Sequence, residues 1–105
     1  MNYLFYLYNI IVLEIVFKDQ LLLDLYSGIR TNDKLFSSNP ILVRKFQKTI
    51  MKIRAIENFN LISLNRGLNF EKLKGSLIGY SSVRIDRKYR LIIKEVYDEI
   101  IPQKI

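Results

Sequence analysis

Residues 70–94, FEKLKGSLIGYSSVRIDRKYRLIIK, contain a basic loop followed by two short apolar strands that carry arginines. Seven Lys or Arg side chains lie between Lys72 and Lys94, against a single acid, Asp86. Cationic side chains that alternate with β-forming residues lie together on one face of a sheet. Such a face is suited to binding an anionic polymer.

The pattern predicts an antiparallel hairpin within this stretch. A three-residue turn over 86–88 places the apolar residues of both strands on one face, namely Val83, Ile85, Tyr89, Leu91 and Ile93. Arg84 and Arg90 then lie nearly opposite each other on the other face. A two-residue turn would instead place Ile85 opposite Arg90 and mix the faces. Because like charges across a strand pair are destabilising, we expect a negative group such as a phosphate between the two arginines.

Length and composition limit the class of protein. At 105 residues, half of them hydrophobic, the chain is expected to form one domain with its own core. It has no Cys and no His, which fits a reducing cytoplasm and excludes a zinc site of the usual ligands and any Ser-His or Cys-His nucleophile pair. Residues 44–94 hold 13 basic and 3 acidic side chains, a net +10, whereas the remainder holds 4 and 7, a net −3. This asymmetry predicts a binding surface.

The N-terminus is strongly apolar. Residues 13–18 alternate between apolar and polar and predict a half-buried strand, with Leu13, Ile15 and Phe17 facing inward. Residues 1–12 are interpreted as an extension of that strand or a leader of uncertain status. The apolar run from Tyr3 to Phe17 is short for a transmembrane helix, so an interfacial membrane anchor at residues 1–17 is the less favoured alternative.

Two helices are expected between this strand and the basic stretch. Asp19 can cap the first, which runs to about Ser27 and ends at Gly28. Asn39 followed by Pro40 starts the second, which runs to about residue 57. Its apolar face comprises Leu42, Val43, Phe46, Ile50 and Ile53, and its basic face comprises Arg44, Lys45, Lys48 and Lys52. Residues 31–38 and 59–69 are predicted to be turns and loops.

This order of elements, an α+β arrangement of the form β-α-α-β-β, resembles the RelE/ParE toxin superfamily. Within it the sequence is most similar to the HigB branch, the plasmid-maintenance killer proteins, over about residues 15–94. The resemblance is most specific at 71–75 (EKLKG), at Gly79 with 82–85 (SVRI), and at 89–92 (YRLI). Residues 1–12 match nothing in the family, so residues 13–105 are taken as the toxin domain.

The resemblance implies an mRNA interferase, a small ribonuclease that cuts translated mRNA at the ribosome. It also implies a partner antitoxin with a helix-turn-helix domain, of the HigA kind. Lys74 matches the basic residue of the family's Leu-Lys-Gly loop, and Arg90 matches the arginine after the aromatic residue in the third strand. Both would contact the scissile phosphate. Glu71 stands where some relatives have a histidine.

These residue types suit cleavage of RNA by its own 2′-hydroxyl, which needs no metal or cofactor. That reaction needs a base for the nucleophile and cations for the pentacovalent phosphate. Arg90 and Arg84 can bind phosphate oxygens in bidentate fashion, Lys74 can donate to the same phosphate, and Glu71 is the nearby carboxylate that could act as the base. The further candidates for RNA binding are Lys72, Arg87 and Lys88.

The sequence departs from the family at its C-terminal end. Family members usually finish with a last strand and a segment carrying Asp, Tyr or His, whereas this sequence stops at Ile105. Tyr97 and Asp98 lie too early to replace that segment. A curtailed last strand would leave the arginine hairpin with an unpaired edge. We therefore expect either a truncated or frameshifted relative, or a sheet that a partner completes.

Two other functions stay open at this point. One is a catalytically dead remnant that still binds RNA or antitoxin, and the other is a small membrane-anchored protein. The individual residues also have structural alternatives. The Lys74-Gly75 pair suits an ordinary turn, the two hairpin arginines suit surface ion pairs, and Tyr80 and Tyr89 are expected mainly to pack.

Overall fold

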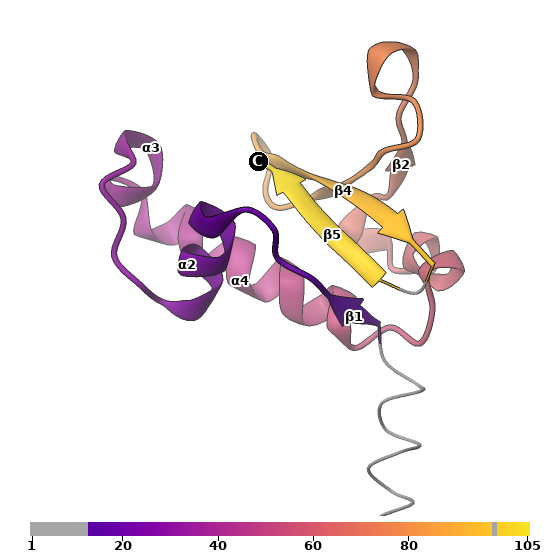
Figure 1. The fold of residues 1–105 in the computed structure, drawn as a ribbon, viewed down its shortest axis with the longest axis horizontal. Coiled ribbons are helices and arrows are strands. Elements are labelled where there is room, and N and C mark those ends of the chain that lie inside the picture. The colour runs from indigo at the N-terminus through magenta and orange to yellow at the C-terminus, as the bar shows by residue number, and fades with distance from the viewer. Residues whose placement is uncertain (1–12, 98) are drawn as a thin grey trace, which may run out of the picture.

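A computed structural model describes residues 13–97 and 99–105 (Figure 1). The predicted N-terminal extension, residues 1–12, and Asp98 lie outside the described residues. The strands are β1 (Glu14–Ile15), β2 (Glu71–Lys72), β3 (Ser81–Arg84), β4 (Arg90–Val96) and β5 (Glu99–Lys104). The α-helices are α2 (Gln20–Ser27), α3 (Lys34–Ser37) and α4 (Pro40–Arg54), and the 3-10 helices are η1 (Phe59–Leu64), η2 (Arg66–Leu68) and η3 (Gly75–Leu77).

The five strands form one mixed sheet in the order β1-β5-β4-β3-β2. β1 runs parallel to β5, and every other neighbouring pair is antiparallel. One face of the sheet shares a core with the helices, since Phe46 and Ile50 of α4 belong to the same buried cluster as Leu91 and Ile93 of β4. The α+β class and the N-terminal strand followed by helices and antiparallel strands are confirmed.

Both predicted helices form where their capping residues begin them. The Asp19 carboxylate accepts a hydrogen bond from the Leu22 N–H (3.0 Å), and α2 ends at Gly28 in a left-handed conformation. The Asn39 side chain accepts from the Leu42 N–H (3.1 Å), and Pro40 occupies the first turn of α4.

The helix α4 is shorter than the sequence predicts. It ends at Arg54, because the N–H of Ile56 bonds to the Ile53 carbonyl (3.0 Å) in a tighter turn and the Ile56 carbonyl accepts from the Leu13 N–H (3.1 Å). The chain after the helix is therefore tied to the start of β1. The predicted faces are confirmed: Phe46, Ile50 and the other core positions are buried, with Val43 half-buried, and the basic stripe is exposed.

Three stretches differ from their predictions. The strand expected over residues 13–18 is reduced to Glu14–Ile15, although the Val16 N–H still bonds to the Ile100 carbonyl (2.9 Å). Residues 31–38 contain the short helix α3, because the Asp33 carboxylate accepts from two backbone N–H groups and Phe36 is buried beneath it. Residues 59–69 are mostly two 3-10 helices, in which Ile62 and Leu68 enter the core.

The prediction of a curtailed last strand is wrong. β5 inserts between β4 and β1, so β4 has a partner on each side and the arginine hairpin has no unpaired edge. Pro102 is tolerated in β5 although it has no backbone N–H to donate. β1 pairs only with Glu99 and Ile100, so the ladder between β1 and β5 requires no hydrogen bond from Pro102. The pairing of β4 with the end of β5 contains a register shift: Ile93 pairs with Pro102, whereas Ile92 pairs with Lys104.

Replacing Phe46 with Ala should lower the free energy of unfolding by about 3–5 kcal/mol, because its ring is fully buried between α4 and the sheet. Urea unfolding followed by circular dichroism measures the change. Met51→Ala on the same helix is the matched control, since Met51 is 61% exposed and its loss should cost much less. Equal losses for the two variants would contradict the core described above.

Candidate nucleic-acid interface

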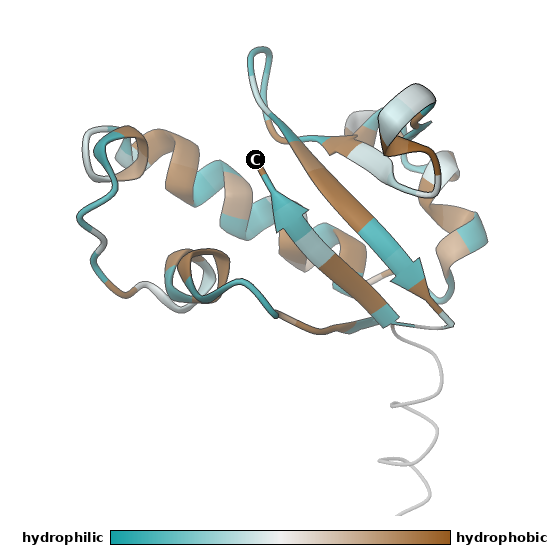
Figure 2. Ribbon diagram, turned by 45° about the horizontal axis from the view of Figure 1, so that its top comes forward, coloured by the Kyte–Doolittle hydropathy of each residue, from teal (hydrophilic) through white to brown (hydrophobic). Residues whose placement is uncertain are grey.

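The β3–β4 hairpin has the predicted register. Arg84 pairs directly with Arg90, and the Ile85 N–H bonds to the Tyr89 carbonyl (3.0 Å), which leaves residues 86–88 as a three-residue turn. The Asp86 carboxylate closes this turn by accepting from the N–H groups of Lys88 (2.8 Å) and Tyr89 (2.7 Å). This side-chain bonding explains how the turn forms without glycine. Figure 2 shows the turn as a hydrophilic tip that leads into the apolar first part of β4.

The pKa of the Asp86 carboxyl lies below its usual value. Partial burial raises the pKa, but the two N–H groups of the turn and the positive charges of Lys45 and Arg84 lower it by more. Lys45 belongs to the basic stripe of α4, so this stripe contributes to the positive potential at the turn.

The open face of the sheet brings a carboxylate to the arginines. Glu71 of β2 pairs with Ser82 of β3, and Ser82 lies two residues before Arg84. Because side chains alternate along strands, Glu71, Ser82, Arg84 and Arg90 share one face, opposite the buried residues of the core. This set of four residues is called the arginine face below.

The two arginines have different environments. Arg90 is half-buried, and its guanidinium donates to the Ser82 hydroxyl (Nε to Oγ, 2.9 Å), the Ser82 carbonyl (Nη2 to O, 3.3 Å) and the Asn69 carbonyl. Arg84 is exposed and donates from Nε to the Asp86 carbonyl (3.1 Å). Arg90 is therefore fixed by the protein, whereas Arg84 can move toward a ligand.

A third cation lies on the same face. Lys94 follows Arg90 by four residues along β4, and its Nζ lies 5.7 Å from the centre of the Tyr80 ring. Tyr80 directly precedes β3 and is half-buried, as expected of a packing residue. Lys94 was not among the residues predicted to bind RNA, although its spacing of two and four residues from Ile92 and Arg90 places it on the same face of the strand.

The remaining predicted RNA-binding residues are spread around the hairpin. Lys72 pairs with Ser81, so it lies on the other face from Glu71. Arg87 and Lys88 are exposed at the turn, where the Lys88 Nζ lies 5.4 Å from the centre of the Tyr89 ring. None of these three lies on the arginine face itself.

Lys74 lies in a loop that stands out beyond β2 (Figure 1). The Leu73 N–H bonds to the Tyr80 carbonyl (2.9 Å) and closes the base of this loop, while Gly75 and Gly79 adopt positive φ angles of 67° and 93°. Lys74 is exposed, and no hydrogen bond within the described part of the chain ties it to the arginine face.

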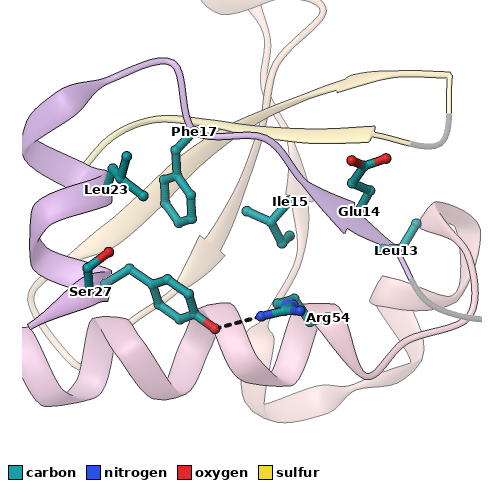
Figure 3. A pocket seen from close by; sticks show the side chains of 8 residues that line it. Leu13, Glu14, Ile15, Phe17, Leu23, Ser27 and Arg54 are labelled. Atoms are coloured by element: carbon teal, nitrogen blue, oxygen red, sulfur yellow. Dashed lines mark hydrogen bonds between the residues drawn. The ribbon is translucent and has the colours of Figure 1, made fainter. Parts of the chain in front are cut away.

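A separate cavity of about 640 Å³ lies between β1, α2 and α4 (Figure 3). Its lining residues are Leu13, Glu14, Ile15, Phe17, Leu23, Tyr26, Ser27 and Arg54. The Arg54 guanidinium is already bound to the Tyr26 hydroxyl (3.0 Å). No residue of the arginine face lines this cavity.

The described residues provide no other obvious centre of chemistry. Across 13–97 and 99–105, no group of three or more His, Cys, Asp or Glu side chains could hold a metal ion. Over the same residues, no helix is long and apolar enough to cross a membrane. The anchor considered from the sequence spans residues 1–17, of which 1–12 lie outside this part and 13–17 include β1.

Solved structures of a bacterial toxin resemble the chain. The heterotetrameric YoeB–YefM toxin–antitoxin complex from Staphylococcus aureus contains a chain that is 27% identical, with a TM-score of 0.52. The YoeB–YefM complex and the YoeB dimer of the same organism give TM-scores of 0.51 at 27% and 28% identity. Each match covers 88% of this chain and 92% of the YoeB chain. The chain has a YoeB-like fold.

The structural similarity bears on the family resemblance inferred from the sequence. It supports the RelE/ParE superfamily, which includes YoeB, but not the HigB branch in particular. It also does not support the predicted truncation, since the match spans 92% of the YoeB chain and β5 is formed. No protein-family model and no curated protein sequence matches the chain.

Replacing Asp86 with Asn should destabilise the protein at pH 7 by about 1 kcal/mol, because the turn loses a charged acceptor of two N–H groups. The folded-state pKa is depressed, so the carboxylate stabilises the fold above the unfolded value of 3.8 and this contribution is lost as the pH falls below it. Urea unfolding at pH 7 and pH 3 should therefore separate the two proteins more at pH 7. A difference that grows toward pH 3 would contradict this account.

Proposed function

We propose that this protein is the toxin of a type II toxin–antitoxin pair and acts as an mRNA interferase on translated mRNA. The observation that carries the proposal is the arginine face, in which Arg84 and Arg90 lie opposite each other with Glu71 on the same face. Similarity to the YoeB toxin over 88% of the chain supports it independently. The site of action would be the cytoplasm, where ribosomes translate.

The arginine face contains groups for two of the steps of RNA cleavage. Glu71, exposed beside Ser82, would remove the proton from the 2′-hydroxyl, whose oxygen then attacks the adjacent phosphorus. Arg90 and Arg84 would stabilise the charge of the pentacovalent phosphate from its two sides. A phosphate between the two guanidinium groups would also relieve their mutual repulsion.

Cleavage also requires a proton for the leaving 5′-oxygen as its bond to phosphorus breaks. The chain contains no His, so the ammonium group of Lys74 or water would have to supply this proton. This favours, as a second candidate function, a protein that binds RNA on the same face without cleaving it. The two functions share one surface and differ only in the chemical step.

The toxin proposal also requires an inhibitory partner. S. aureus YoeB has been crystallised in complex with its antitoxin YefM, which supports an antitoxin for this chain. A helix-turn-helix partner of the HigA kind, and with it the HigB branch and a role in plasmid maintenance, remain predictions of the sequence alone. Coexpression with the product of the adjacent gene would test whether a partner neutralises the protein.

Expression of the chain in bacteria should arrest growth and produce translation-dependent cuts in mRNA, and Arg90→Ala should abolish both. Loss of one such donor typically costs about a hundredfold to a thousandfold in rate. Growth curves and primer extension measure the two effects. Arg30→Ala, which removes an exposed arginine of the α2–α3 connection, is the matched control and should retain activity.

The outcome of that experiment separates the two candidates. Cleavage by the wild type and by Arg30→Ala, but not by Arg90→Ala, supports the nuclease. Harmless expression of a folded wild type with intact mRNA would leave only the binding function.

Binding of single-stranded RNA should weaken steeply with salt, because phosphate contacts release counterions. Arg84→Ala should reduce the slope of log K against log salt by about 0.7, the value for one phosphate contact on a single strand. Fluorescence anisotropy with a labelled oligonucleotide measures both slopes, with Arg30→Ala as the control. An affinity indifferent to salt would rule out the arginine face as the binding surface.

A further inference from the structure

The guanidinium of Arg90 is held by acceptors from two separate parts of the chain. Ser82, across the hairpin, contributes its hydroxyl and its carbonyl, and Asn69, which follows η2, contributes its carbonyl. Nε and Nη2 thus donate to the protein, while Nη1 donates no hydrogen bond within the described residues. The edge of the guanidinium that carries Nη1 remains available to a ligand.

Both acceptors are themselves restrained. Ser82 is only 3% exposed in the middle of β3, so its hydroxyl is buried against Arg90 with little freedom to turn elsewhere. Asn69 has a φ of 44° and a ψ of 57°, the left-handed conformation that a non-glycine residue rarely adopts. This conformation directs its carbonyl toward Arg90, which lies 21 residues later in the chain.

We propose that Ser82 and the backbone carbonyl of Asn69 are positioning elements that hold Arg90 in the orientation needed to bind a phosphate. The proposal rests on the proposed function, in which Arg90 contacts the RNA phosphate, and assigns a role to two residues to which the family resemblance gave none. Neither Ser82 nor Asn69 would touch the substrate. Both act through Arg90.

The physical reason is the flexibility of an arginine side chain. A free arginine loses much rotamer entropy when it binds a phosphate, and its charge is repelled by Arg84 directly opposite. Bonds to three acceptors remove that freedom before the ligand arrives, so the donor is already oriented when negative charge develops. Arg84, which is exposed, is not held in this way and could close on the phosphate afterwards.

The test compares Ser82→Thr with Ser82→Val in the full chain. The two replacements have nearly the same shape, but only Thr keeps a hydroxyl to accept from Nε of Arg90. The Nε–H resonance of Arg90, assigned by its loss in Arg90→Lys, reports the hydrogen bond directly by its exchange with water. Single-turnover cleavage and RNA anisotropy report the consequence.

The Ser82→Thr variant should keep a slowly exchanging Arg90 Nε–H and near-wild-type kinetics. In the Ser82→Val variant this proton should exchange quickly with water, and kcat should fall by about tenfold to a hundredfold with little change in KM. This split is expected when a catalytic donor is misplaced rather than removed. Equal Nε–H protection and equal kcat in Thr and Val would overturn the proposal. A merely structural role for Ser82 would move the unfolding midpoint without this split between kcat and KM.

Asn69 provides a second pair of variants in case position 82 does not tolerate the added methyl groups. Asn69→Gly keeps the left-handed conformation and the carbonyl that accepts from Nη2 of Arg90, and should retain near-wild-type kcat. Asn69→Val strains that conformation and should lower kcat with little change in KM, in the same way as Ser82→Val. Wild-type kcat in a folded Asn69→Val would count against the role of this carbonyl.

Failure of the positioning proposal can be told apart from failure of the proposed function. If the wild type binds RNA without cleaving it, the proposed nuclease function fails. The Ser82→Thr and Ser82→Val variants are then compared by their RNA affinity, which Ser82→Val should lower about tenfold. If the wild type binds no RNA, both fail, whatever the state of the Nε–H signal.

Discussion

The pairing of Arg84 with Arg90 across the hairpin is the constraint around which the open face of the sheet is organised. Two guanidinium groups directly opposite each other repel, so the pairing persists only because the strands are held together by other interactions. Those interactions are the neighbouring pair of Val83 with Leu91, which is buried on the core face of the sheet, and the turn closed by Asp86. The repulsion is left for an anion to relieve, which connects the stability of the hairpin with its proposed ligand.

The two faces of the sheet divide structure from function. The helical face buries Phe46 and Ile50 of α4 against β4 and supplies most of the hydrophobic stabilisation. The open face holds the charged groups, which would be costly to bury without partners. Because side chains alternate, a shift of β3 by one residue would turn its charged side chains toward the helices and its apolar side chains toward the open face. The core therefore protects the geometry of the arginine face indirectly, by making any other register unfavourable.

Within the YoeB-like fold, the two arginines have complementary roles in the proposed reaction. Arg90, bound to Ser82 and Asn69, forms a fixed element of the site, and Arg84, anchored only at the turn, is an adjustable one. A site with one fixed and one mobile donor can admit a long, flexible polymer and still present an oriented charge to its phosphate. The loop that contains Lys74 projects beyond β2, and Lys94 extends the positive surface along β4.

Local physical chemistry accounts for what the sequence by itself determined. Helix starts at Asp19 and Asn39 follow from side-chain capping within three residues, and the hairpin register follows from the alternation of apolar and charged residues. Only the tertiary structure decided that β5 inserts between β4 and β1 and that Asn69 turns its carbonyl onto Arg90. Both depend on contacts between residues far apart in the chain, whose energies are set by the packed core and leave no periodic trace in the sequence.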